Sequence, residues 1–207
     1  MLDPVLRNQL AERVPRCLES GVPGSTARLR GSLATGNADL YSDIDILWVV
    51  PDRAFPPSTN TVGRVLAQVR PVESLRSDPT ARSSGRRLFF ARFKDVPLFW
   101  RLDLEVVPVS GCVAHEDGSD DQDSNHWSRT ESALMNAVAA VKAHLRGDDN
   151  RAQEVLLPGY ARVALEPPGP SLKDQIQGLV AGIREIDPGI GELLRRVEDL
   201  LVEAFEA

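Results

Sequence analysis

One stretch, residues 29–50, constrains the fold of this chain more than any other. It carries a Gly31-Ser32 pair and then Asp43 and Asp45, which flank one isoleucine and lead into an apolar run. The side chains of a β-strand alternate between its two faces, so both aspartates are predicted to lie on one face. Two adjacent carboxylates repel each other unless a cation lies between them, and magnesium prefers such hard oxygen ligands. The stretch therefore predicts a buried strand that begins at a magnesium site.

The Gly31-Ser32 pair has the properties of a phosphate-binding turn. Ten residues separate it from Asp43. A glycine lets the backbone come close to a ligand, and a serine offers a hydroxyl and a backbone N–H to a phosphate oxygen. The alternative is a polar loop leading into a buried strand with two solvated aspartates at its start. A calcium-binding loop also contains Asp-x-Asp, but the glycine and glutamate that it requires further along are missing.

Gly-Ser, ten residues, Asp-x-Asp and an apolar strand together resemble the signature of the nucleotidyltransferase superfamily, which has the DNA polymerase β-like fold. The resemblance covers about residues 27–108. It implies an α+β fold, in which a mixed β-sheet with flanking helices is followed by a C-terminal helical bundle. It also implies that Asp43 and Asp45 bind two Mg²⁺ ions, and that Gly31 and Ser32 hold the β- and γ-phosphates of a nucleoside triphosphate.

The resembling enzymes add a third carboxylate from a neighbouring strand, which binds the activating metal and accepts the proton of the attacking hydroxyl. Asp103 fits this role, because it lies mid-strand between apolar residues. Glu105 shares its predicted face and is the alternative metal ligand. Glu105 can also be a sheet-edge carboxylate that pairs with Arg101.

Basic residues are candidates for completing the phosphate site. In the resembling enzymes a basic residue often comes from the helical part, and Lys142 and Arg146 lie one turn apart on a predicted helix. Lys142 is assigned to nucleotide binding, and the alternative is a solvated helix end whose cations suit the helix dipole. Residues 76–87 are predicted to form a basic loop, whose four arginines either reach a triphosphate or stay solvated.

Hydrophobic periodicity and cap residues predict the elements of the first half. Asp3 is a suitable N-cap, and Pro4 suits the first helical position. Strict alternation of polar and apolar residues from Arg101 onward predicts a strand. The predicted elements are a helix at residues 3–19, strands at 26–30 and 44–50, a helix at 60–69, and a hairpin of strands at 88–94 and 98–109.

The second half is predicted to be helical. Apolar residues recur at helical spacing across 128–146 and in two later segments that open near Ser171 and Pro188, with a shorter helix at 149–157. Residues 115–124 are acidic and lack apolar anchors, which predicts a flexible connector. The predicted domains are a catalytic domain at residues 1–114 and a helical domain at residues 125–207.

Charge and cysteine usage narrow the class of protein. The net charge is −6, and a protein that binds nucleic acid usually carries a basic face, so a nucleic-acid substrate is not expected. Two cysteines make no disulfide framework, which favours a reducing cytoplasm. The sequence shows no signal peptide pattern and no apolar stretch of membrane-spanning length, so no membrane partner is expected.

The resemblance therefore implies a metal-dependent transferase. A catalytic domain followed by a helical domain, in a chain this short, is similar to the enzymes that inactivate lincosamide and aminoglycoside antibiotics. The implied reaction moves a nucleoside monophosphate, with AMP from ATP as the expected case, onto a hydroxyl of a small molecule. The alternatives are an AMP transferase that acts on a protein, and a nucleotide-binding module without catalysis.

Overall fold

The computed structural model describes residues 2–79, 85–111 and 127–205. The chain divides into two compact units, Met1–Trp127 and Ser128–Ala207. The predicted domain boundary, the acidic connector at 115–124 and part of the basic segment, 80–84, lie outside the described residues. No helix in the described part of the chain is long and apolar enough to cross a membrane.

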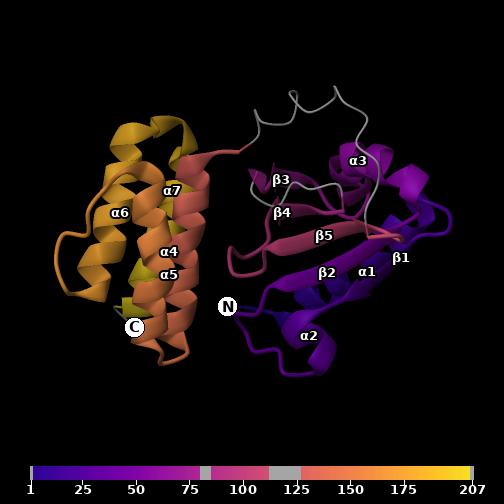
Figure 1. The fold of residues 1–207 in the computed structure, drawn as a ribbon. Helices are drawn as coiled ribbons and strands as arrows, with labels where there is room; N and C mark the ends of the chain where they lie inside the picture. Colours follow the sequence, from indigo (N-terminus) through magenta and orange to yellow (C-terminus); the bar gives the residue numbers. More distant parts are fainter. Residues whose placement is uncertain (1, 80–84, 112–126, 206–207) are drawn as a thin grey trace. The chain divides into compact units, whose positions relative to one another are not determined.

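The first unit is built on a five-stranded mixed sheet with the strand order β1-β2-β5-β4-β3 (Figure 1). The central strands β2 and β5 are parallel, and every other neighbouring pair is antiparallel. With its flanking helices the unit confirms the predicted α+β class. The strands are β1 (Thr26–Leu29), β2 (Ile44–Val50), β3 (Val72–Ser77), β4 (Arg87–Phe93) and β5 (Leu102–Pro108).

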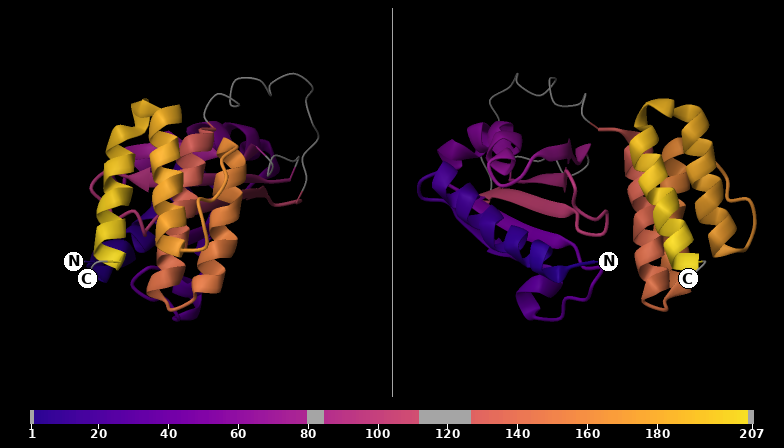
Figure 2. Two further views of the ribbon diagram at one scale, coloured as in Figure 1. Left: turned by 90° about the vertical axis from the view of Figure 1, so that its left-hand side faces the viewer. Right: turned by 180° about the vertical axis from the view of Figure 1, so that it is seen from behind.

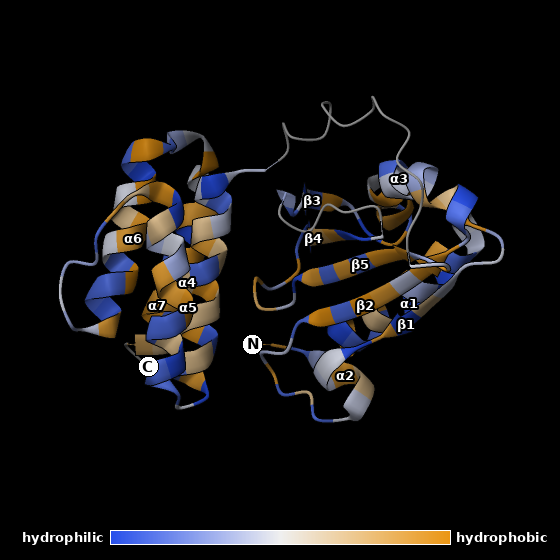
Figure 3. Cartoon of the chain, viewed as in Figure 1, coloured by the Kyte–Doolittle hydropathy of each residue, from blue (hydrophilic) through white to orange (hydrophobic). Residues whose placement is uncertain are grey.

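The two faces of this sheet differ in burial, because the strands alternate between buried and partly exposed residues. Figure 3 shows the hydropathy of each residue along the strands. In β2 and β5 every second side chain is buried, beginning with Ile44 and Leu102, because apolar and polar residues alternate. The helices α1 (Pro4–Gly21) and α3 (Phe55–Ala67) pack against the sheet and contribute buried aliphatic side chains to its core (Figure 2). The polar side chains of β2 and β5 lie on the opposite face. They include the predicted site residues Asp45 and Asp103.

The first helix follows the sequence prediction closely. The side chain of Asp3 accepts a hydrogen bond from the backbone N–H of Val5, and Pro4 occupies the first turn, where its missing N–H costs nothing. The helix continues through Pro15 to Gly21, slightly beyond the predicted end.

Three elements of the first unit differ from the prediction. The five-residue helix α2 (Gly31–Thr35) replaces part of the expected polar loop. Helix α3 begins at Phe55 rather than at residue 60, since two prolines fit its first turn. Strand β3 was not predicted, because its sequence lacks regular alternation, and it includes Arg76 and Ser77 of the predicted basic loop.

The predicted hairpin is confirmed in its pairing, because β4 and β5 are antiparallel neighbours. Its second arm is shorter than predicted, since β5 begins at Leu102 rather than at residue 98. Phe99 and Trp100 are instead buried in the irregular segment that precedes β5.

The second unit consists of packed helices, as predicted (Figure 2). Ser128 and Ser171 cap two of its helices through their side chains. Helix α5 continues through Pro158, further than the predicted end at residue 157. The helices are α4 (Arg129–Leu145), α5 (Asp149–Val163), α6 (Leu172–Ile186) and α7 (Gly191–Phe205), with the short η4 (Pro188–Ile190) before the last.

Candidate active site

A transverse row of side chains crosses the polar face of the sheet. Asp45 of β2 is in register with Asp103 of β5, and Asp103 is in register with Phe90 of β4. Residues in register on neighbouring strands have side chains on the same face, and the strands lie about 4.8 Å apart. Asp43 lies immediately before β2, two residues before Asp45. The sheet therefore aligns Asp45 with Asp103, and Asp43 directly precedes the strand that carries Asp45.

Gly31 packs directly against Asp45. Its φ of +59° is in the left-handed region, and a Cβ atom placed there would lie 2.5 Å from Oδ2 of Asp45. The backbone N–H of Arg30 also donates to the carbonyl of Asp45 at 2.8 Å. A side chain at residue 31 would thus displace a carboxylate of the candidate site, whether or not a phosphate binds nearby.

Ser32 lies in α2, next to this contact. Its carbonyl accepts hydrogen bonds from Asn37 N–H at 3.0 Å and from the hydroxyl of Thr35 at 3.3 Å. Its side chain is partly exposed. The Gly31-Ser32 turn is therefore fixed beside the aspartates, and its role in phosphate binding stays a prediction.

Arg101 holds both carboxylate oxygens of Asp103. Its Nε donates to Oδ1 at 2.6 Å and its Nη2 donates to Oδ2 at 2.7 Å. This is the bidentate geometry in which arginine binds a carboxylate most strongly. The guanidinium carbon also lies 4.6 Å from the centroid of the Phe90 ring, within the range of a cation–π contact. The face that carries the aspartates therefore includes one firmly held cation.

The electrostatic surroundings of Arg101 extend beyond Asp103. Burial disfavours its charged form, yet the pKa of the guanidinium is raised, because Asp103 attracts it and accepts its hydrogen bonds. Asp43 and Asp45 attract it as well. One positive charge thus interacts with all three aspartates.

Glu105 has different partners from those the sequence suggested. Both Arg30 and Arg86 form ion pairs with its carboxylate, the latter at 2.7 Å. The alternative in which Glu105 pairs with Arg101 is wrong, because the alternation that puts three polar side chains on one face does not fix which neighbours meet. Strand β5 also lies inside the sheet, between β2 and β4, so Glu105 is not an edge residue.

A buried arginine that the sequence analysis missed anchors the loop before Asp43. The guanidinium of Arg7 in α1 donates to the backbone carbonyl of Asp39, and Nε1 of Trp100 donates to the carbonyl of Leu40 at 2.8 Å. Within the loop, the hydroxyl of Ser42 donates to Asp39 at 2.8 Å. Arg7 is only 4% exposed. Its position on the apolar stripe of a predicted helix was the available signal.

The predicted basic residues Lys142 and Arg146 belong to the second unit. Lys142 is buried in α4, and Arg146 is exposed at the helix C-terminus, where its N–H donates to backbone carbonyls. Their assignment to nucleotide binding stays a prediction.

The donor set suits magnesium in kind, since the three aspartates offer only hard oxygen ligands. No group of three His, Cys, Asp or Glu side chains among the described residues is arranged as a metal site. The contact with Arg101 directs both oxygens of Asp103 toward a guanidinium. Arg101 uses one lone-pair position on each oxygen of Asp103, so a metal bound there would share these oxygens with a guanidinium.

Comparisons with known proteins find similarity in structure alone. No protein-family model matches the chain, and no curated protein matches its sequence. Similar solved structures include a cytoplasmic RNA terminal U-transferase, with 12% identity, a TM-score of 0.37, and coverage of 66% of this chain and 39% of that chain. The polymerase core of TRAMP, an RNA surveillance complex, has 12% identity, a TM-score of 0.38, and coverage of 89% and 58%.

The RNA terminal uridylyl transferase Cid1 has 11% identity, a TM-score of 0.35, and coverage of 69% of this chain and 41% of that chain. The chain thus spans between 39% and 58% of the length of these structures. Similarity at this level identifies neither substrate nor activity.

Proposed function

We propose that the protein transfers a nucleoside monophosphate from a nucleoside triphosphate to a hydroxyl group, with divalent metal as cofactor. The supporting observation is the convergence on one sheet face of Asp45 and Asp103 in register, with Gly31 packed against Asp45. A loop leading into an ordinary buried strand has no need for such a contact. Asp43 completes a set of three carboxylates at the point where the Gly31-Ser32 turn arrives.

In this proposal each residue has a separate task. Asp43 and Asp45 hold metal, and Ser32 donates a hydrogen bond to a phosphate oxygen. A new bond forms between the acceptor oxygen and the α-phosphorus while the bond to the bridging oxygen breaks and pyrophosphate leaves. Asp103 takes the proton of the acceptor hydroxyl. Bound divalent cations neutralise the triphosphate and make that hydroxyl more acidic.

The proposed acceptor is a small hydroxylated molecule such as an antibiotic. The net charge of −6 supports a neutral or cationic acceptor over a long polyanion, because like charges repel at the protein surface. Transfer to a protein hydroxyl, and nucleotide binding without transfer, are the competing functions.

The test is a screen in which the purified protein is incubated with magnesium and each nucleoside triphosphate. Parallel reactions contain a panel of hydroxylated antibiotics, a protein mixture, or an RNA oligonucleotide. Mass spectrometry should detect a nucleoside monophosphate adduct on a small molecule, together with pyrophosphate release. An adduct only on protein or only on RNA would refute the proposed acceptor, and tight nucleotide binding without any adduct would refute transfer itself.

Ser32→Ala provides a second arm of this test. A contact made in both the ground state and the transition state affects KM more than kcat, so this variant should raise the KM for nucleotide with little change in kcat. Thr35→Ala is the matched control, because its hydroxyl bonds to carbonyls within the same short helix. Equal kinetics in both variants would remove Ser32 from the phosphate site.

A further inference from the structure

The proposal concerns Arg101, whose side chain lies among the three aspartates of the candidate site. Its two hydrogen bonds take one lone-pair position on each oxygen of Asp103. A divalent cation that uses Asp103 as a ligand binds one or both of these same oxygens. The guanidinium and the metal therefore compete for one carboxylate.

The contacts of Arg101 show that its position is held from several sides. The guanidinium of Arg101 lies against the ring of Phe90. The backbone carbonyl of Arg101 accepts a hydrogen bond from the N–H of Ile44 at 2.9 Å. Ile44 lies between the other two aspartates. The backbone of Arg101 thus helps to hold the start of β2, while its side chain balances the charges of that strand and of Asp103.

The charges of the aspartates and of Arg101 also favour competition between the guanidinium and a metal ion. Three carboxylates that attract one guanidinium repel each other, and that guanidinium lowers the repulsion. When divalent metal brings positive charge to the same place, the guanidinium repels the metal and is no longer needed for balance.

We infer that Arg101 is a positioning residue that competes with divalent metal for Asp103, so that metal binding requires at least one of the two Arg101–Asp103 hydrogen bonds to open. This inference rests on the proposed function, because it assumes that the aspartates bind metal. Arg101 is then a counter-ion that keeps the aspartates together when no metal is bound, and that weakens metal binding.

The test measures Mn²⁺ affinity by electron paramagnetic resonance and calorimetry, without nucleotide or acceptor, for the parent and Arg101→Gln. Removing the rival charge should tighten Mn²⁺ binding by about fivefold or more. The same variant should have a lower Tm in the presence of a chelator, and excess Mn²⁺ should restore much of the difference. Unchanged or weaker Mn²⁺ binding by Arg101→Gln would overturn the inference.

Two further variants make the comparison specific. Arg16→Gln removes the same charge from α1, where Arg16 lies 4.0 Å from Glu12 and both side chains are exposed, and should leave Mn²⁺ affinity within about twofold of the parent. Phe90→Leu removes the ring that holds the guanidinium but keeps the charge, so it should tighten Mn²⁺ binding by a smaller factor. Equal tightening by Arg16→Gln would assign the effect to net charge and refute competition for Asp103.

Failure of the inference and failure of the proposed function give different results. If the parent binds Mn²⁺ and Arg101→Gln binds no better, the competition is refuted while the metal site stands. If neither protein binds Mn²⁺, the aspartates are not a metal site and both proposals fail. If only Arg101→Gln binds Mn²⁺, the competition is supported in its strongest form.

Discussion

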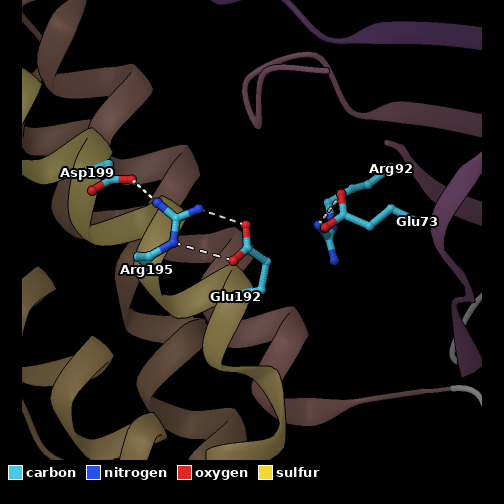
Figure 4. Close-up of polar contacts among 5 residues, drawn as sticks. All are labelled: Glu73, Arg92, Glu192, Arg195 and Asp199. Carbon is cyan, nitrogen blue, oxygen red and sulfur yellow. Dashed lines mark hydrogen bonds and ion pairs between the residues drawn. The ribbon is translucent and has the colours of Figure 1, made fainter. Parts of the chain in front are cut away.

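The ion pairs of the two units have different surroundings. In the first unit Arg92 pairs with Glu73 at 3.0 Å, and the two side chains are 9% and 23% exposed (Figure 4). On α7 of the second unit, Arg195 binds Glu192 at 2.8 Å and Asp199 at 2.9 Å, with all three side chains at least 60% exposed (Figure 4). The pairs have similar lengths, so distance does not distinguish them.

Solvent exposure decides what each pair does. An exposed pair exchanges good hydration for a contact of similar energy, so it contributes little to stability. A buried charge has lost its hydration and depends on its partner, so removing the partner is costly. The first unit buries Arg7, Arg76 and Arg92 and places Arg101 among aspartates. The buried guanidinium groups therefore depend on their partners in the fold.

The largest effect is expected from neutralising Asp45. Asp45→Asn should lower the transfer rate at least a hundredfold, because loss of a charged metal ligand costs about 3 kcal/mol or more. Circular dichroism should be unchanged, since removing one of several neighbouring negative charges relieves repulsion. Asp43→Asn should behave in the same way. Near-normal magnesium-dependent turnover in either variant would contradict the assignment of this face as a metal site.

A second prediction compares two carboxylates of β5 that lie on one face. Asp103→Asn should keep nucleotide binding but lower kcat by about a hundredfold, because it removes the proposed proton acceptor. Glu105→Gln should keep kcat within about threefold of the parent, since the partners of Glu105 are two partly exposed arginines. Calorimetry and product formation check both variants. An inactive Glu105→Gln beside an active Asp103→Asn would reverse the assignment.

A third, smaller effect is expected at the partly buried pair in Figure 4. Glu73→Ala should lower the free energy of unfolding by about 1–2 kcal/mol, because it removes a partner of Arg92, a residue that is only 8% exposed. Urea denaturation of the full chain is the measurement. A loss too small to detect would show that burial is a poor guide to the importance of pairs in this protein.

The smallest effect is expected on α7. Arg195→Ala should leave the Tm at neutral pH unchanged within error, because its pairs are exposed to solvent. The hydrogen bond from Arg195 lowers the pKa of Glu192. Any stabilisation by this pair is therefore present above the ordinary glutamate pKa and is lost as the pH falls through the lowered pKa. Thermal melts from pH 7 to pH 3 check this. A clear decrease in Tm at pH 7 would contradict the idea that the exposed pairs of the second unit contribute little to stability.

Helices and strands were predicted well where apolar residues repeated regularly, either at every second position or at helical spacing. Strand β2 was predicted at the residues where it lies, because its apolar positions alternate without interruption. The helices of the second unit followed from their apolar stripes. Strand β3 and helix α2 were missed, because the first lacks alternation and the second, with five residues, is too short to show a repeating apolar pattern.

The candidate site was predictable as a face but not as a set of contacts. Alternation placed Arg101, Asp103 and Glu105 on one side of β5, yet it did not show which carboxylate the arginine binds. The structure pairs Arg101 with Asp103, while Glu105 receives arginines from distant parts of the chain. Such choices depend on side-chain rotamers and on tertiary neighbours, which no local pattern encodes.

The parallel pairing of β2 with β5 has a consequence for folding. Asp45 and Asp103 become neighbours only when these central strands pair, and α3, β3 and β4 lie between them in the sequence. A contact that closes so long a loop carries a large entropic cost and forms slowly compared with local hairpins and helices. The carboxylates therefore meet only once the centre of the sheet is complete, and a nascent or partly folded chain presents no assembled acidic cluster to metal ions in the cell.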